Sequence, residues 1–274
     1  MLPLDLFIIR HGESEGNRAI GQFRKDKDSI FPPEFLNRFT GHFRLTDKGK
    51  EQARLDGEWF KKWLNEKKLP RFDRHLVSTH IRASETAALL NLPNAEWELD
   101  SQLHERDIGL WGSLPDKNWQ ERFDRNVNLE QIHYFYTRMP GGESIENTCV
   151  RLRPVVSDLD KEEANTNRVV VVAHSDVAQA LRVIFEGTTP DEFHERWKAN
   201  QPDFRIGNGQ IIHYTRVNPA DPMCTHHDRF RWVRSINLWD PSYAGHDWRP
   251  IEKHRYSNEE LLAMVERFPK LIDD

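Results

Sequence analysis

The hydrophobic pattern of the chain alternates between short continuous apolar runs and longer amphipathic segments. Leu6–Ile9 and Val169–Ala173 are uninterrupted apolar runs, and the second is rich in β-branched valine. Runs of this kind predict strands that are covered on both faces, as in a parallel sheet between two layers of helices. Phe72–Ser78 and Ile211–Val217 are predicted as two further strands.

Amphipathic segments with helix-capping signals lie between these strands. Thr46 is the expected N-cap of a helix that runs to about Lys67, and Ile81–Leu90 and Asp176–Phe185 are two more predicted helices. The remaining predicted helices are Ser144–Ala164, with an expected kink or break at Pro154, one that begins at Thr189-Pro190, and one from Ser257 to about Phe268. This alternation predicts an α/β protein with three α/β/α layers around a mostly parallel central sheet.

Three segments fit the alternation poorly. Residues 18–44 are polar, contain Pro32-Pro33 and are predicted as an inserted loop. Residues 112–140 are predicted as a cap segment, and residues 218–274 as a C-terminal extension over the core. Because no internal repeat or low-complexity linker separates these segments, we expect residues 1–274 to form a single α/β domain.

Composition and charge narrow the class of protein. Apolar residues make up 37% of the 274 residues and aromatic residues 11%, which is enough to fill a core. The net charge of −5 provides no basic field for non-specific nucleic-acid binding. Two cysteines give no disulfide framework, no apolar run is long enough to span a bilayer, and the N-terminus has no signal-peptide pattern. We therefore expect a cytoplasmic protein without nucleic-acid or membrane partners.

Basic side chains follow three of the predicted strands. Arg10 and His11 come directly after the first strand, His174 comes directly after Val169–Ala173, and Arg82 lies about one helical turn beyond a third strand. Ligands bind at the carboxyl ends of strands in open α/β sheets, so we expect these side chains to meet at one edge. Two guanidinium groups and two imidazoles fit a tetrahedral oxyanion such as a phosphoryl group.

Transfer of a phosphoryl group also requires a nucleophile and a proton source. Neutral imidazole is nucleophilic near pH 7, so a histidine of this cluster can accept the phosphoryl group covalently. Glu105 is the candidate acid, because a neighbouring phosphate dianion raises the pKa of a carboxyl group. Gly12 permits a sharp turn after the first strand, and Ser14 and Asn17 place polar groups on the next helical turn, where free N–H groups favour an anion.

Six short segments of the chain form one recognisable pattern. They are Arg10-His11-Gly12-Glu13-Ser14 with Asn17, Leu45-Thr46 with Gly49 and Gln52-Ala53, Arg82 with Glu85-Thr86-Ala87, Glu105-Arg106 with Gly109, Pro140-Gly141-Gly142-Glu143-Ser144, and His174. Their content and order resemble the histidine phosphatase superfamily, whose members are phosphoglycerate mutase-like. The resemblance covers about residues 4–217 and implies the phosphoglycerate mutase-like α/β fold.

The resemblance also implies a role for each candidate residue of the cluster. His11 would be phosphorylated, while Arg10, Arg82 and His174 would hold the phosphoryl oxygens and stabilise the transition state. Glu105 would protonate the leaving group and then activate the water that hydrolyses phosphohistidine. No metal or other cofactor is implied, because the arginines provide the positive charge that magnesium provides in other phosphoryl-transfer enzymes.

Five further residues are candidates for substrate binding. The resemblance implies that Ser14 and Asn17 assist in holding the phosphoryl group, although helix capping is an alternative explanation for both. Thr40 and Gly41 lie in "NRFTGHF", which resembles a substrate-binding segment of the mutases. Ser175 stands where the family usually has glycine, so its hydroxyl either crowds the pocket or contacts phosphate.

The leading functional hypothesis is a metal-independent phosphatase that hydrolyses a small-molecule phosphomonoester through phosphohistidine on His11. A cofactor-dependent phosphoglycerate mutase is an alternative, but Asp107-Ile108 replace the His-Tyr pair expected after the acid, and the chain has no Arg-Arg pair. A non-catalytic phosphate-binding module is the other alternative. Phe135 or Tyr136 is expected at the pocket entrance. Whether the chain is a monomer or a homodimer stays open.

Overall fold

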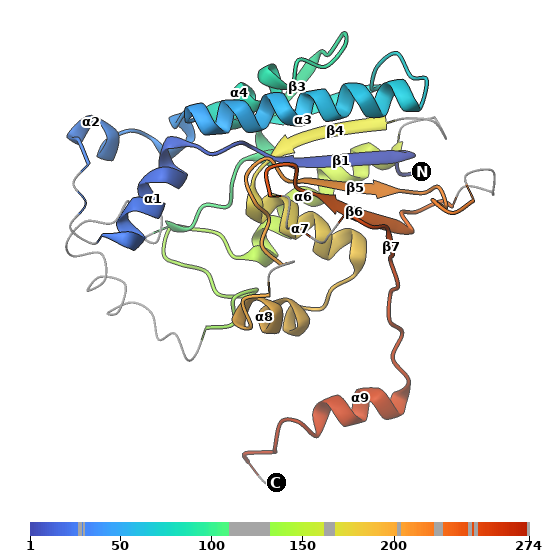
Figure 1. Cartoon of the computed structure of the whole chain (residues 1–274). Helices are drawn as coiled ribbons and strands as arrows, with labels where there is room; N and C mark the ends of the chain where they lie inside the picture. The colour runs from blue at the N-terminus through green and yellow to red at the C-terminus, as the bar shows by residue number, and fades with distance from the viewer. Residues whose placement is uncertain are drawn as a thin grey trace.

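The computed structural model describes residues 1–26, 29, 31–109, 132–161, 168–201, 204–221, 227–240, 243 and 246–272. Figure 1 shows a central sheet with helices on both of its faces. The strands run in the order β3-β2-β4-β1-β5-β6-β7 across this sheet. Their bounds are β1 Asp5–Arg10, β2 Arg74–Ser78, β3 Trp97–Asp100, β4 Arg168–Ala173, β5 Ile211–Thr215, β6 Trp232–Ile236 and β7 Arg249–Pro250.

The four strands β3, β2, β4 and β1 are parallel, which confirms the mostly parallel core of the sheet. β5, β6 and β7 each pair antiparallel with the strand before them in the sheet order. In the pairing of β1 with β4, Arg10 lies opposite Ala173. The residues after these two strands, His11 and His174, therefore leave the sheet side by side at its carboxyl edge.

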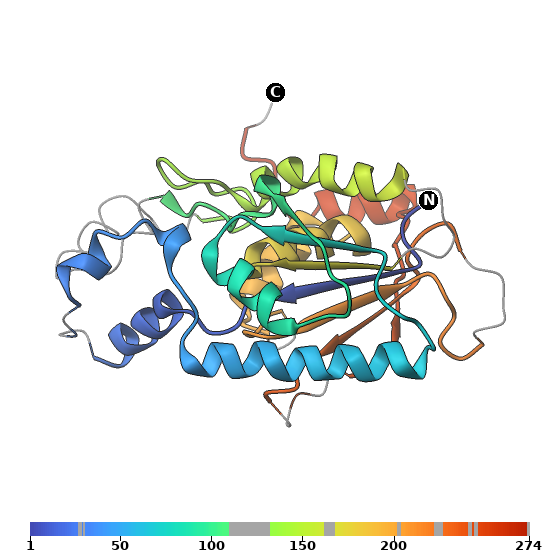
Figure 2. The same ribbon diagram turned by 90° about the horizontal axis from the view of Figure 1, so that it is seen from above.

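Helices form the two outer layers of an α/β/α arrangement, with α3 Asp47–Glu66 and α4 Ile81–Leu90 on one face of the sheet and α6 Ile145–Lys161 and α7 Ser175–Glu186 on the other. The remaining helices are α1 Glu15–Lys25, α2 Pro33–Leu36, α8 Pro190–Lys198 and α9 Asn258–Val265. Figure 2 shows α3 along one side of the sheet and α6 along the other. Phe7 and Ile9 pack in the core beneath α3 and α4, while Leu6 and Ile8 pack beneath α6 and α7. Both faces of β1 are thus buried, as its continuous apolar run predicts.

The sequence predicted a kink or a break at Pro154, and the break is wrong, because α6 continues from Ile145 to Lys161 with the proline inside it. Pro154 lacks the N–H that would bond to the carbonyl of Val150, one turn earlier. Pro154 is exposed, and Val150 is 55% exposed. Water can therefore bond to this carbonyl, and the buried face of the helix keeps its contacts.

The prediction of an inserted loop over residues 18–44 is also wrong for much of that segment. α1 covers residues up to Lys25, and α2 and a short 3₁₀ helix, Thr40–His42, follow it. The helix α1 forms because Gly16, Ala19 and Phe23 recur on one face and are buried there. A reciprocal capping box of Ser14 and Asn17 also supports its first turn.

The C-terminal segment does not simply cover the core. β6 and β7 extend the sheet, with Val233 and Ile236 buried, and α9 lies apart from the body in Figure 1.

Most of the predicted cap segment cannot be compared with the prediction, because residues 112–131 lie outside the described residues. The assignment of residues 1–274 to a single domain stays a prediction. No helix within the described parts of the chain is long and apolar enough to cross a membrane.

Candidate active site

A cavity of about 810 Å³ lies at the carboxyl edge of the sheet, beyond β1 and β2. Arg10 and His11 line it from the end of β1, Arg82 lines it from the first turn of α4, and Glu105 lines it from the loop after the second 3₁₀ helix, Ser101–Leu103. The sequence predicted that these residues would meet at this edge, and the structure brings them together. His174 is buried directly behind His11, with the two ring centroids 5.1 Å apart.

Two hydrogen bonds fix the state of the His11 ring. Its Nδ1 lies 2.7 Å from the carbonyl oxygen of Gly12, and its Nε2 lies 3.0 Å from Nε of Arg82. Because a carbonyl only accepts and a guanidinium only donates, Nδ1 carries the proton, and Nε2 is unprotonated with its lone pair accepting the bond from Arg82. Burial lowers the pKa of His11 well below its usual value, and the charges of Arg82 and Arg10 lower it further. The ring is therefore neutral at pH 7.

Two guanidinium groups lie near the His11 ring, because Arg82 bonds its Nε2 and Arg10 lines the same cavity. Arg82 is only 8% exposed, and its Nη1 donates to the carbonyl of Thr40 at 2.9 Å. Arg10 donates from Nη1 to the carbonyl of Ile206 at 2.5 Å, and its buried Nε has no hydrogen-bond partner in the described structure. Burial lowers the pKa of both groups, yet arginine stays protonated in proteins. Both therefore present fixed positive charge to the cavity.

His174 holds the second imidazole of the pair. It is fully buried, and its Nε2 lies 2.8 Å from Oγ of Ser78 at the end of β2. Its Nδ1 is buried and has no hydrogen-bond partner among the described residues. Burial, and then the charge of Arg82, lower its pKa well below the usual value for histidine. A buried neutral imidazole with a free nitrogen is suited to bonding an oxygen of a bound anion.

The Glu105 carboxyl group is placed at the amino end of α7. Its Oε1 accepts from the N–H of Arg106 at 2.9 Å and from the N–H of Asp176 at 3.3 Å. Burial and the negative charge of Asp176 raise the pKa of Glu105 to about 7. A carboxyl group with this pKa can donate a proton and also accept one near neutral pH.

The comparison with known proteins agrees with this arrangement. The model of the histidine phosphatase superfamily (branch 1) matches residues 6–202. The chain belongs to the histidine phosphatase superfamily. Curated relatives include 6-phosphofructo-2-kinase/fructose-2,6-bisphosphatase from Aquarana catesbeiana, 28% identical over 191 residues, which are 69% of this chain and 34% of the relative. The same enzyme from Caenorhabditis elegans is 28% identical over 185 residues, which are 68% of this chain and 35% of the relative. The chain thus spans about a third of these relatives.

Solved structures of the superfamily share the fold of this chain. A mycobacterial glucosyl-3-phosphoglycerate phosphatase in complex with VO3 has a TM-score of 0.56 and 22% identity, with 77% of this chain and 92% of that chain covered. A putative alpha-ribazole-5'-P phosphatase from Escherichia coli has a TM-score of 0.56 and 20% identity, with 83% and 96% covered. These matches confirm the phosphoglycerate mutase-like α/β fold.

Glycine is required at positions 12 and 49, where the loop after β1 packs against the first turn of α3. A Cβ atom on Gly12 would collide with the backbone carbonyl of Gly49, and one on Gly49 would collide with the carbonyl of Glu13. The N–H of Gly12 also donates to Oγ1 of Thr86 on α4, at 3.1 Å. The close approach of these backbones sets the position of the neighbouring His11.

The candidate substrate-binding residues have different outcomes. Ser14 and Asn17 line the cavity and form a reciprocal capping box at the start of α1, so their phosphate contacts stay a prediction. Thr40 and Gly41 also line the cavity, whereas Ser175 is not among its described lining residues.

The prediction that Phe135 lies at the pocket entrance is wrong, because its ring is buried in the core against Phe193. Tyr136 is 49% exposed and is not among the described residues that line the cavity.

Two groups of residues in this site were missed by the sequence analysis. Arg106 donates to Asp176 at 2.7 Å and to the hydroxyl of Tyr134 at 2.8 Å, which holds the Asp176 charge beside Glu105. His80 and His104 lie on the cavity wall, and the His80 ring is 4.9 Å from that of His174. Their positions in the sequence could have indicated a place in the site. Asp176 lies two residues after His174, and His80 lies two residues after the end of β2.

Proposed function

We propose that this chain is a metal-independent phosphatase that hydrolyses a small-molecule phosphomonoester through a phosphohistidine on His11. The observation that carries the proposal is the state of the His11 ring, whose Nε2 is unprotonated, accepts from Arg82 and belongs to a cavity that Arg10 also lines. Glu105, with a pKa of about 7, provides the acid that such a reaction needs. The family membership supports the same chemistry.

In the first step, Arg82 exchanges its hydrogen bond to Nε2 of His11 for one to a phosphoryl oxygen, which frees the lone pair of Nε2. Nε2 then attacks the phosphorus atom and the bond from phosphorus to the ester oxygen breaks. The Nδ1–H of His11 stays bonded to the carbonyl of Gly12, so the ring keeps its orientation. Arg10, Arg82 and His174 bond the phosphoryl oxygens as negative charge spreads over them. The protonated carboxyl group of Glu105 gives its proton to the departing oxygen, which leaves as an alcohol.

In the second step, water attacks the phosphorus atom of the phosphohistidine. The carboxylate of Glu105 accepts a proton from this water, and the bond between phosphorus and Nε2 breaks. Inorganic phosphate is released, His11 is neutral again and Glu105 is again protonated. Each group therefore returns to its starting state, and no metal is needed in either step.

The size and lining of the cavity support a substrate larger than a bare phosphate ester of a three-carbon acid. A volume of about 810 Å³ is within the usual range for small-molecule sites. Ile20, Phe39 and Phe43 give the wall an apolar part, and His42, His80 and His104 give it a polar part. Relatives named for fructose bisphosphate and glucosyl phosphoglycerate favour a phosphorylated sugar or sugar acid.

The proposal is tested by hydrolysis of p-nitrophenyl phosphate and a panel of sugar phosphates. We expect turnover by the unaltered chain, a loss of at least about 10³-fold in kcat for His11→Ala, and little change for the exposed His254→Ala control. Equal activity of the chain and His11→Ala would contradict the proposal. Interconversion of the two monophosphoglycerates that exceeds their hydrolysis, after addition of bisphosphoglycerate, would favour a mutase instead.

A further inference from the structure

The helix α9 exposes an apolar surface that no described part of its own chain covers. Leu262 is 63% exposed, Val265 is 65% exposed, and Phe268, just beyond the helix, is 71% exposed. Figure 1 shows α9 apart from the other helices, at the end of the segment that follows β7. A helix of eight residues is only marginally stable in water without packing contacts. A second surface is therefore needed to stabilise it.

Acidic side chains lie beside this apolar stripe. Leu261, Leu262 and Val265 share one face at 100° per residue, and Glu259 and Glu266, seven residues apart, share the adjacent flank. Both glutamates are exposed. The partner surface should therefore combine an apolar floor with a basic rim.

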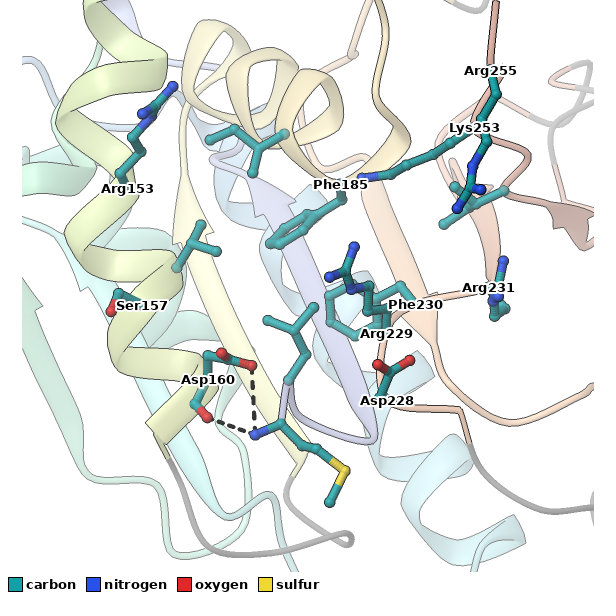
Figure 3. Close-up of a pocket in the computed structure, with 15 residues that line it drawn as sticks. Arg153, Ser157, Asp160, Phe185, Asp228, Arg229, Phe230, Arg231, Lys253 and Arg255 are labelled. Carbon is teal, nitrogen blue, oxygen red and sulfur yellow. Dashed lines mark hydrogen bonds and ion pairs between the residues drawn. The ribbon is translucent and has the colours of Figure 1, made fainter.

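A groove with these properties lies at the amino end of β1, at the opposite edge of the sheet from His11. Its volume is about 970 Å³. Leu2, Val156 and Ile184 line it and are only partly buried against the core, so they keep apolar surface for a ligand. Figure 3 shows Arg153, from α6, on one side of the groove and the segments that carry Arg231 and Lys253 on the other.

The rim of this groove is basic. Arg153, Arg229, Arg231, Lys253 and Arg255 line it, and none of these five side chains makes an ion pair or hydrogen bond within the described structure. Burial and the nearby charge of Arg229 lower the pKa of Lys253, so these cations repel one another. The groove also contains Asp160, which pairs with the Met1 amine at 3.5 Å, and Asp228. The excess of positive charge favours an acidic partner.

We propose that α9 of one copy of the chain lies in this groove of a second copy. The apolar stripe would cover Leu2, Val156 and Ile184, and the acidic flank would face the arginines of the rim. Each chain has one such helix and one such groove, so two reciprocal contacts close a dimer with two-fold symmetry. Arg255 lines the groove and lies three residues before α9, so each helix starts beside the interface that it completes.

The first test measures the mass of the full chain by analytical ultracentrifugation at micromolar concentrations. We expect a dimer, and we expect Leu262→Asp on the helix and Arg153→Glu/Arg229→Glu in the groove each to weaken dimerisation by at least about tenfold. Arg54→Glu/Lys62→Glu, on the exposed face of α3 across the sheet, reverses the same number of charges as the groove variant and should leave the dimer intact. A monomeric unaltered chain, or dimers that survive both sets of changes, would overturn the proposal.

The second test mixes the two defective variants. The Leu262→Asp chain keeps an intact groove, and the Arg153→Glu/Arg229→Glu chain keeps an intact helix. The mixture should form a heterodimer through one intact contact and should therefore associate more tightly than either variant alone. A mixture that stays monomeric would overturn docking between copies and would favour α9 in the groove of its own chain. Circular dichroism melting curves confirm that both variants are folded.

Discussion

The reactivity of His11 depends on which of its two nitrogens carries the proton. The bond from Nδ1 to the carbonyl of Gly12 and the bond from Arg82 to Nε2 select one tautomer, in which Nε2 is unprotonated and its lone pair accepts from Arg82. The opposite behaviour is seen at Glu105, where burial and Asp176 favour the protonated form. The same buried cavity therefore holds a neutral base and a neutral acid, which is the pair that phosphoryl transfer to histidine requires.

The pKa of Glu105 predicts the pH dependence of catalysis. For an alkyl phosphate, kcat/KM should fall as the pH rises through about 7, because Glu105 loses the proton that the leaving oxygen needs. The pKa of His11 lies well below its usual value, so His11 should add no fall between pH 6 and pH 8. The measurement is the pH profile of the unaltered chain beside that of Glu105→Gln, in which this decline should be absent. A decline of the same midpoint in both would contradict the assignment of Glu105.

The catalytic residues were predictable because each follows a strand or begins a helix at the same edge of the sheet. The roles of Asp176 and Arg106 were not predictable, because these two side chains bond to each other although they are 70 residues apart in the sequence. The assignments of Ser14 and Asn17 show a related limit, since a capping box and a phosphate contact use the same residue types.

At the scale of elements, local signals predicted the helices well. Thr46, Thr189 and Ser257 each cap the helix that the sequence placed after them, and Ile81–Leu90 has the predicted bounds. The strands β3 and β6 were missed, and the helical turn expected at Ser14 and Asn17 was not extended to the full length of α1. Both strands are short, and pairing with strands from distant parts of the chain or from a neighbouring segment stabilises them.

The proline inside α6 leads to a stability prediction. Pro154→Ala restores an N–H that can donate to the carbonyl of Val150 and removes the ring from that turn. Because the site is exposed, no core contact is lost. We expect the free energy of unfolding to rise by about 1–3 kcal/mol, measured by urea titration. An unchanged or lower stability would mean that the helix already accommodates the proline without strain.

At the scale of the whole molecule, the topology of the sheet assembles the site. β1, β2 and β4 are neighbours in the sheet although they are far apart in the sequence, so His11, Ser78 and His174 meet at their carboxyl ends. The apolar runs predicted this parallel core. They did not predict the antiparallel pairing of β5, β6 and β7, because a buried strand has the same pattern in either direction. The groove proposed to bind α9 lies at the opposite edge of the sheet, so it is separate from the catalytic cavity.

The most direct test of the account is to trap the phosphorylated enzyme. Glu105→Gln is mixed rapidly with p-nitrophenyl phosphate, whose leaving group needs little protonation, and the reaction is quenched in alkali. We predict a burst of p-nitrophenol and about one acid-labile phosphoryl group per chain, located by mass spectrometry on His11 and absent from His11→Ala. A burst without a labelled protein, or a phosphoryl group on any residue other than His11, would contradict the central claim.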